Sequence, residues 1–147
     1  MGGQPGSARP SGMDVDGLRA FLAEHYPAAL EVPVAIGPHI DQSLLLTLTP
    51  DATMLRPGGT ISGPTLMTLA DVAMYYLLLM ELGPVALAVT TSLHIDFLRR
   101  PDPKPIVAKA ELLKLGRTLA VGRVTMTSDG DARPIAHASL TYSLPPR

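Results

Sequence analysis

The sequence predicts an α+β domain in which a curved antiparallel β-sheet wraps around one long central helix. The first observation behind this prediction is a strongly apolar stretch over 63–82, bounded by Gly-Pro pairs at both ends. The second is the series of β-rich segments that follows it, joined mostly by short turns, which force antiparallel pairing. Because a helix that is apolar on all sides needs cover on nearly every side, a curved sheet around it is the economical arrangement.

The part of the chain before the long helix carries a short amphipathic helix and one strand. Residues 14–26 show helical spacing of apolar side chains, with Asp14 or Asp16 as the cap and Pro27 as the stop. The apolar stripe of this helix consists of Val15, Leu18, Phe21 and Leu22. A strand is predicted over 43–48, where apolar residues are bounded by turn-forming residues.

The second half of the chain is predicted to be almost entirely strand and turn. The β-rich segments cover 85–99, 106–115, 119–127 and 133–144. From Thr90 the first segment alternates, which predicts one face with Thr90, Ser92, His94 and Asp96 and another with Thr91, Leu93, Ile95 and Phe97. The first face is polar and would be a solvated or interfacial surface, or would hold a proton relay through His94 and Asp96.

Composition narrows the possible functions. The 147 residues are expected to form a disordered tail over 1–12 and a single domain over 13–147. A formal net charge of −1 and the absence of Trp argue against a nucleic-acid surface. The apolar helix is short for a bilayer span and carries Asp71, so no membrane partner is expected. The absence of cysteine excludes a thiolate nucleophile and fits a cytoplasmic location, and four scattered histidines predict no metal or other cofactor.

Two residues of the central helix point to chemistry. Gly63 lies at its start, where backbone N–H groups are unpaired and suit an oxyanion. Asp71 is surrounded by Leu69, Ala70, Val72 and Ala73, and a carboxylate in an apolar wall needs a reason to persist. It would act as a general base or as a nucleophile, or it would be a structural residue satisfied by hydroxyls or an arginine. Gly63 has its own structural alternative as a simple capping glycine.

These residues form part of a motif that resembles the PaaI-like hotdog-fold thioesterases. The motif reads Ser62-Gly63-Pro64 and then Leu69-Ala70-Asp71, with Leu93-His-Ile-Asp-Phe-Leu-Arg99 and Leu115-Gly-Arg-Thr118 further on. The likeness spans about residues 32–144 and implies a hotdog fold and hydrolysis of acyl-coenzyme A (acyl-CoA) thioesters. It also implies a homodimer, which in this family often pairs into a homotetramer.

The resemblance assigns roles to single residues. Asp71 matches the family's catalytic carboxylate, and Gly63 matches the glycine whose N–H polarises the thioester carbonyl from the opposite subunit. Ser62 stands where His is usual, and would cap the helix or polarise the carbonyl with its hydroxyl. Arg56 stands where Asn or Gln is usual, and would be a surface residue, hold Asp71 ionised or grip a carboxylate of the acyl group. Pro64 replaces a second glycine and has no N–H to give.

Further substrate contacts are predicted around these residues. Tyr75 lies four residues after Asp71, on the same helix face, where it would orient the water or pack in the core. A group of basic residues at strand ends and turns would bind the coenzyme A phosphates or only keep the surface charged; it comprises Arg99, Arg100, Lys104, Lys114 and Arg117. The sequence thus predicts an acyl-CoA thioesterase. The alternatives are a non-catalytic acyl-CoA or fatty-acyl binding module and a hotdog hydratase.

Overall fold

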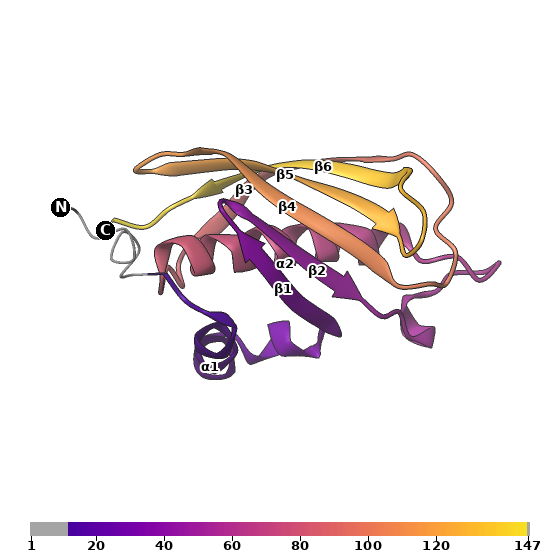
Figure 1. Cartoon of the computed structure of the whole chain (residues 1–147), viewed down its shortest axis with the longest axis horizontal. Coiled ribbons are helices and arrows are strands. Elements are labelled where there is room, and N and C mark those ends of the chain that lie inside the picture. Colours follow the sequence, from indigo (N-terminus) through magenta and orange to yellow (C-terminus); the bar gives the residue numbers. More distant parts are fainter. Residues whose placement is uncertain (1–11, 147) are drawn as a thin grey trace.

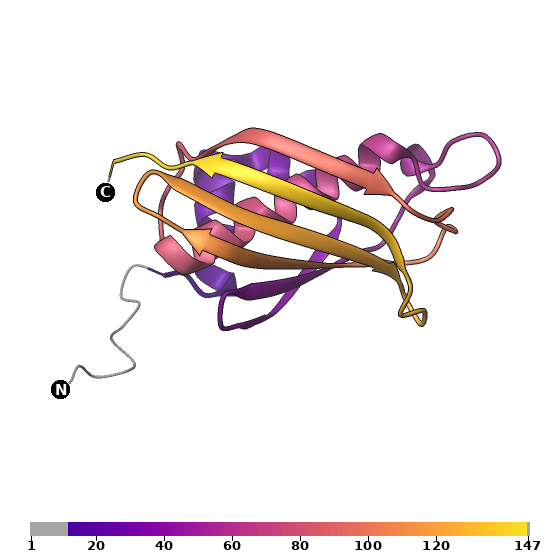
Figure 2. The same cartoon turned by 90° about the horizontal axis from the view of Figure 1, so that it is seen from above.

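The structure is a computed structural model that describes residues 12–146, so the tail predicted over 1–12 lies almost wholly outside the described residues. A single curved sheet wraps around one long helix, and a short helix covers a side of that helix that the sheet leaves open (Figure 1, Figure 2). The elements are α1 Val15–His25, a 3₁₀ turn Pro27–Glu31, β1 Val34–Ile40, β2 Ser43–Leu48, a 3₁₀ turn Ala52–Met54, α2 Gly63–Leu82, β3 Val89–Phe97, β4 Ile106–Leu115, β5 Leu119–Ser128 and β6 Pro134–Ser143. This is the predicted architecture, and it is the hotdog arrangement.

The central helix α2 begins and ends where the Gly-Pro pairs predict. The Ser62 side chain caps it by accepting from the Thr65 amide at 3.2 Å, and Gly83 ends it with a φ of 87°. It is long and apolar enough to cross a membrane, but two-thirds of that apolar stretch, 67%, is buried inside the fold. A core helix explains the same composition. Helix α1 begins after Asp14, whose carboxylate accepts from the Gly17 amide at 2.7 Å.

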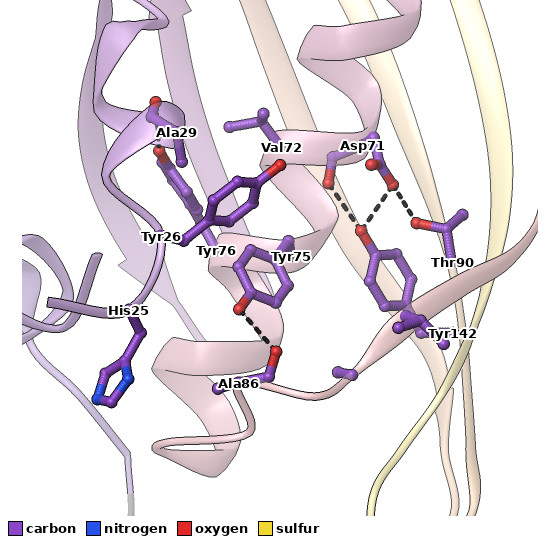
Figure 3. Close-up of a pocket in the computed structure, with 12 residues that line it drawn as sticks. His25, Tyr26, Ala29, Asp71, Val72, Tyr75, Tyr76, Ala86, Thr90 and Tyr142 are labelled. Atoms are coloured by element: carbon purple, nitrogen blue, oxygen red, sulfur yellow. Dashed lines mark hydrogen bonds between the residues drawn. The ribbon is translucent and has the colours of Figure 1, made fainter. Parts of the chain in front are cut away.

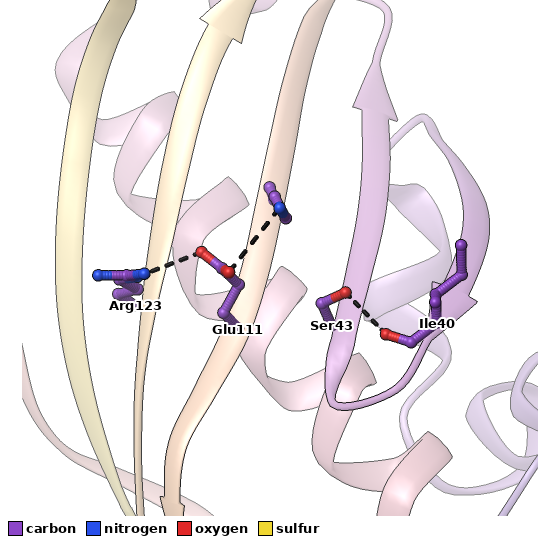
Figure 4. Close-up of polar contacts among 5 residues, drawn as sticks. Ile40, Ser43, Glu111 and Arg123 are labelled. Carbon is purple, nitrogen blue, oxygen red and sulfur yellow. Dashed lines mark hydrogen bonds and ion pairs between the residues drawn. The ribbon is translucent and has the colours of Figure 1, made fainter.

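All neighbouring strands are antiparallel, in the order β1-β2-β4-β5-β6-β3. Contacts on the sheet's outer face hold neighbouring strands together. Arg123 on β5 donates to Glu111 on β4 at 3.2 Å, and the Ser43 hydroxyl closes the β1–β2 turn by donating to the Ile40 carbonyl at 2.8 Å (Figure 4). Strand β3 forms one edge of the sheet, and its Val89 and Phe97 are 55% and 51% exposed. An unpaired strand edge with exposed apolar residues at both ends suits pairing with a second chain.

The structure corrects the sequence predictions in two places. Strand β1 was not predicted, because Gly37-Pro38 interrupts it and the register shifts between Ile36 and His39. The face predicted for Thr90 is wrong: the β3–β6 register shifts between Thr90 and Ser92, which is a β-bulge. The extra residue turns the Thr90 side chain toward α2. The same bulge therefore brings this hydroxyl to the candidate site.

Candidate active site

Asp71 lies at a pocket of about 340 Å³ where four parts of the chain meet. The walls come from the end of α1 and the turn after it, the middle of α2, the loop before β3 with the start of that strand, and the end of β6 (Figure 3). The chain's four tyrosines, which are Tyr26, Tyr75, Tyr76 and Tyr142, all line this pocket. A pocket of this size falls in the range of small-molecule sites, and its mixture of rings and few polar groups is typical of them.

The Asp71 carboxylate is fixed by two hydroxyl groups. Thr90 donates to its Oδ1 atom at 2.5 Å, and Tyr142 donates to the same atom at 2.6 Å (Figure 3). The Tyr142 hydroxyl also lies 3.1 Å from the main-chain carbonyl oxygen of Asp71. Both donors stabilise negative charge on the carboxylate, and both approach the same oxygen. The structure shows no hydrogen bond from the described residues to the other oxygen, Oδ2.

The remaining tyrosines build the pocket wall with their rings, and the hydroxyls of two of them bind carbonyl groups. Tyr75 donates to the Ala86 carbonyl at 3.2 Å and Tyr76 to the Ala29 carbonyl at 3.2 Å. Burial raises the pKa of Tyr76 to about 12, so its hydroxyl stays a donor at neutral pH. Tyr26 covers Tyr75 edge-on, with ring centroids 6.1 Å apart, and forms a rim of the pocket. Tyr75 therefore shares the pocket with Asp71, as its position on the helix predicts.

Gly63, whose amide is predicted to hold the thioester carbonyl, lies at a second pocket, of about 600 Å³, at the start of α2. Arg56, Gly63, Pro64 and Arg99 line it together with Phe97. No described residue accepts a hydrogen bond from the Gly63 amide, which is what an oxyanion donor requires.

Ser62 lines neither pocket, because its hydroxyl is used within the helix cap: it lies 2.8 Å from the Thr65 hydroxyl and accepts from the Thr65 amide. Arg117 lies at the β4–β5 turn, in a shallow pocket with Leu144 and Pro146.

Gly63 and Asp71 do not meet within one chain. They are eight residues apart in α2, and a helix rises about 1.5 Å per residue, which separates them by about 12 Å along the axis. One carbonyl group cannot contact both at hydrogen-bonding distance. The structure likewise separates Arg56 from Asp71, since each lines a different pocket.

The architecture and the paired pockets can be compared with known proteins. The sequence profile of the thioesterase superfamily matches residues 58–135, which is more than half of the chain and includes both Gly63 and Asp71. The chain belongs to the thioesterase superfamily. A comparison with curated proteins finds no match.

Solved structures extend the likeness beyond the matched segment. A candidate thioesterase from a Silicibacter species is 41% identical, with a TM-score of 0.80 over 91% of this chain and 93% of that one. Zebrafish thioesterase superfamily member 2 is 21% identical, with a TM-score of 0.74 over 88% and 94% of the two chains. The E. coli PaaI protein of the phenylacetic acid degradation operon is 22% identical, with a TM-score of 0.71 over 86% and 94%. These likenesses confirm the PaaI-like resemblance, and the last two show the hotdog fold alone.

Sequence reasoning missed two contacts of this thioesterase-superfamily site. Thr90 was assigned to the wrong strand face, and Tyr142 was not singled out because it lies 71 residues from Asp71 and carries no local motif. The one available signal was a phenol among the apolar inward-facing residues of the last strand, which are Ala136, Ala138 and Leu140. Among residues 12–146, no three His, Cys, Asp or Glu side chains lie close enough together to hold a metal ion.

Proposed function

We propose that this thioesterase-superfamily protein hydrolyses acyl-CoA thioesters as a homodimer. The observation that carries the proposal is Asp71: a carboxylate on a largely buried helix, in the lining of a pocket, that is fixed through Oδ1 by two hydroxyl donors and has no described hydrogen bond to Oδ2. Asp71 is only partly buried, so its second oxygen is open to a water molecule, which a general base needs. The membership of the superfamily supports thioester hydrolysis in general, and the choice of acyl-CoA is the proposal.

The proposed site combines the two pockets across a subunit boundary. Within one chain the Gly63 amide is about 12 Å from Asp71 along α2, so one subunit supplies the carboxylate and the other the amide. The unpaired edge of β3 supports such a pairing, and Phe97 brings this edge close to Gly63, since its ring atom Cζ lies 3.4 Å from where a Gly63 Cβ would stand. Pairing of two dimers into a tetramer is part of the same proposal.

The reaction uses each group once. The Gly63 amide donates to the thioester carbonyl oxygen, and Asp71 takes a proton from a water molecule as the water oxygen bonds to the carbonyl carbon. The negative charge gathers on the carbonyl oxygen, opposite the amide. The carbon–sulfur bond then breaks and coenzyme A leaves as the thiolate. The proton held by Asp71 passes to this thiolate, which restores the carboxylate, and the acid loses its own proton to solvent. In the nucleophilic variant an Asp71 oxygen bonds to the carbonyl carbon, the carbon–sulfur bond breaks and the thiolate leaves. Water then hydrolyses the mixed anhydride to the acid, and the proton left on Asp71 passes to the thiolate.

The acyl group and the coenzyme A are proposed to occupy opposite ends of this composite site. The tyrosine-lined pocket beside Asp71 suits the apolar acyl group, and its 340 Å³ is about twice the 150 Å³ of a cavity that takes one benzene ring. Arg56, Arg99 and Arg100 lie together at the second pocket and suit the phosphates. Arg117 is a further candidate for a phosphate at the hairpin turn.

Release of free thiol from a panel of acyl-CoA thioesters tests the proposal. We expect turnover by the wild-type protein and a loss of about 10²-fold or more in Asp71→Asn, which keeps the shape of the side chain but not its basicity. Asp41→Asn is the matched control, because Asp41 is an exposed carboxylate at the β1–β2 turn, lines neither pocket, and has a positive φ of 54° that asparagine also tolerates. Saturable binding without turnover would replace the proposal by the binding-module alternative, and full activity of Asp71→Asn would refute it.

A further inference from the structure

The hydroxyl of Tyr142 has two possible acceptors on Asp71 and only one proton to give. It lies 2.6 Å from the carboxylate Oδ1 atom and 3.1 Å from the main-chain carbonyl oxygen. The shorter contact, with the charged acceptor, is the stronger one. The hydroxyl proton is therefore directed to the carboxylate, while its oxygen rests beside the helix backbone. This arrangement ties the Asp71 side chain to β6.

Tyr142 is built to remain a donor. It is 2% exposed. Burial is the main cause that raises the pKa of its phenol far above the usual value, and the hydrogen bond to Asp71 is the second cause. At neutral pH it cannot become an anion that would repel the carboxylate. Apart from Asp71, the titratable groups around the pocket are His25 and Tyr26 from the α1 end, Tyr75 and Tyr76 from α2, and Tyr142 from β6. Neither a lysine nor an arginine is among the residues that line this pocket.

We propose that Tyr142 is a positioning residue: its hydroxyl holds Oδ1 of Asp71 so that Oδ2 is the oxygen that reacts. Thr90 donates to the same oxygen, so the two donors together fix the plane of the carboxylate. An oxygen that already accepts two O–H hydrogen bonds is the weaker base, which leaves Oδ2 to take the proton of the attacking water. The inference rests on the proposed function and adds a residue that lies outside the matched segment 58–135.

The variant Tyr142→Phe removes this hydroxyl and little else, because the ring stays in the core between β3 and β5. Losing a donor to the ionised carboxylate disfavours the charged form, so the acidic limb of the kcat profile is expected to move up by about one pH unit. At the optimum, kcat is expected to fall roughly tenfold, because the freed carboxylate rotates, while KM stays within about twofold. A residue that served packing alone would not move the pH profile.

Tyr76→Phe is the matched control. It deletes an equally buried phenolic hydroxyl from the same pocket wall, but that hydroxyl donates to the Ala29 carbonyl and not to Asp71. The acidic limb of the kcat profile of Tyr76→Phe is expected to stay where it is in the wild-type protein. A second readout needs no turnover: the carboxyl-carbon NMR signal of Asp71, assigned by its loss in Asp71→Asn, is followed through a pH titration. Its midpoint is expected to rise in Tyr142→Phe and to stay unchanged in Tyr76→Phe.

The outcomes separate the two proposals. An unmoved acidic limb and an unmoved NMR midpoint in Tyr142→Phe overturn the positioning role, even if Asp71→Asn is inactive and the proposed function stands. Full activity of Asp71→Asn overturns the proposed function, whatever Tyr142→Phe does. Equal shifts in Tyr142→Phe and Tyr76→Phe also overturn the positioning role, because they would reflect the loss of any buried hydroxyl.

Discussion

Two inactive variants of this thioesterase-superfamily chain are expected to restore activity to each other when their subunits are combined. Asp71→Asn removes the proposed base. Gly63→Pro removes the proposed carbonyl-binding amide at the first helical position, where proline fits, and Ser62 before it already has the extended ψ of 150° that a following proline requires. Gly63→Ala is the matched control, since it adds a Cβ 3.4 Å from the Phe97 ring but keeps the amide.

The expected magnitudes follow from a site shared between subunits. Loss of one oxyanion donor costs about 10²–10³-fold in kcat, and the homodimers of both variants fall by at least about that much. A mixed dimer of Asp71→Asn with Gly63→Pro holds both defects in one site and an intact pair in the other. In a symmetric dimer it therefore has about half of the wild-type activity. Gly63→Ala is expected to retain more activity than Gly63→Pro, and the ratio of their kcat values measures the contribution of the Gly63 amide to catalysis.

The mixed dimer is prepared by coexpressing the two chains with different affinity tags, purifying over both, and measuring thiol release. The reciprocal arrangement sharpens the test: a dimer with both substitutions in one subunit and a wild-type partner is expected to be inactive. If each chain instead carried a complete site, the two results would exchange places. Half activity in the reciprocal dimer with none in the mixed dimer would refute the shared site.

Three further predictions concern the core, a buried pair and the pocket rim. Gly122→Ala places a Cβ 2.7 Å from the Glu111 carbonyl, and we expect a loss of about 1–3 kcal/mol or more in the free energy of unfolding in urea. His39→Ala removes a 2.6 Å contact to the 2%-exposed Glu81 side chain and is expected to cost about 3 kcal/mol in the same assay, with an unchanged midpoint contradicting the pair's role. Tyr26→Ala opens the pocket rim and is expected to shift kcat/KM about tenfold toward bulkier acyl groups, whereas an unchanged ranking would show that the acyl group does not reach Tyr26.

Features encoded by neighbouring residues were predictable from the sequence. The bounds of α2 follow from Gly63-Pro64 and Gly83-Pro84. The proline of the first pair fits the first turn of a helix, and the glycine of the second pair fits a helix end that the following proline cannot continue. The start of α1 follows from the Asp14 cap in the same way. The curved sheet around one helix followed because one all-round apolar helix and a set of antiparallel strands have few ways to pack, and the resemblance to a known family implied the hotdog fold. Asp71 was also visible, because a carboxylate among buried apolar residues stands out in the pattern.

The partners of Asp71 were not predictable, because they depend on register and on distant parts of the chain. One extra residue in β3 decides whether Thr90 faces α2 or solvent, and the local alternation favours the wrong answer. Tyr142 reaches Asp71 only because β6 lies between β5 and β3 in the sheet. The sequence therefore indicated which carboxylate to suspect, while the structure was needed to see how that carboxylate is held.

The placement of Gly63 and Asp71 on one helix also restricts how two subunits must meet. The proposed carbonyl contact is the Gly63 amide at the first position of α2. Because Pro64 after it has no N–H, the Gly63 amide is the donor that must lie within hydrogen-bonding distance of the thioester carbonyl. For this amide to face the Asp71 of a second chain, the two α2 helices must run antiparallel, with the start of one beside the middle of the other. A twofold axis between the α2 helices then creates two equal sites at once. A parallel or head-to-tail pairing would leave one carboxylate without an amide, so the symmetry of the dimer is itself part of the catalytic proposal.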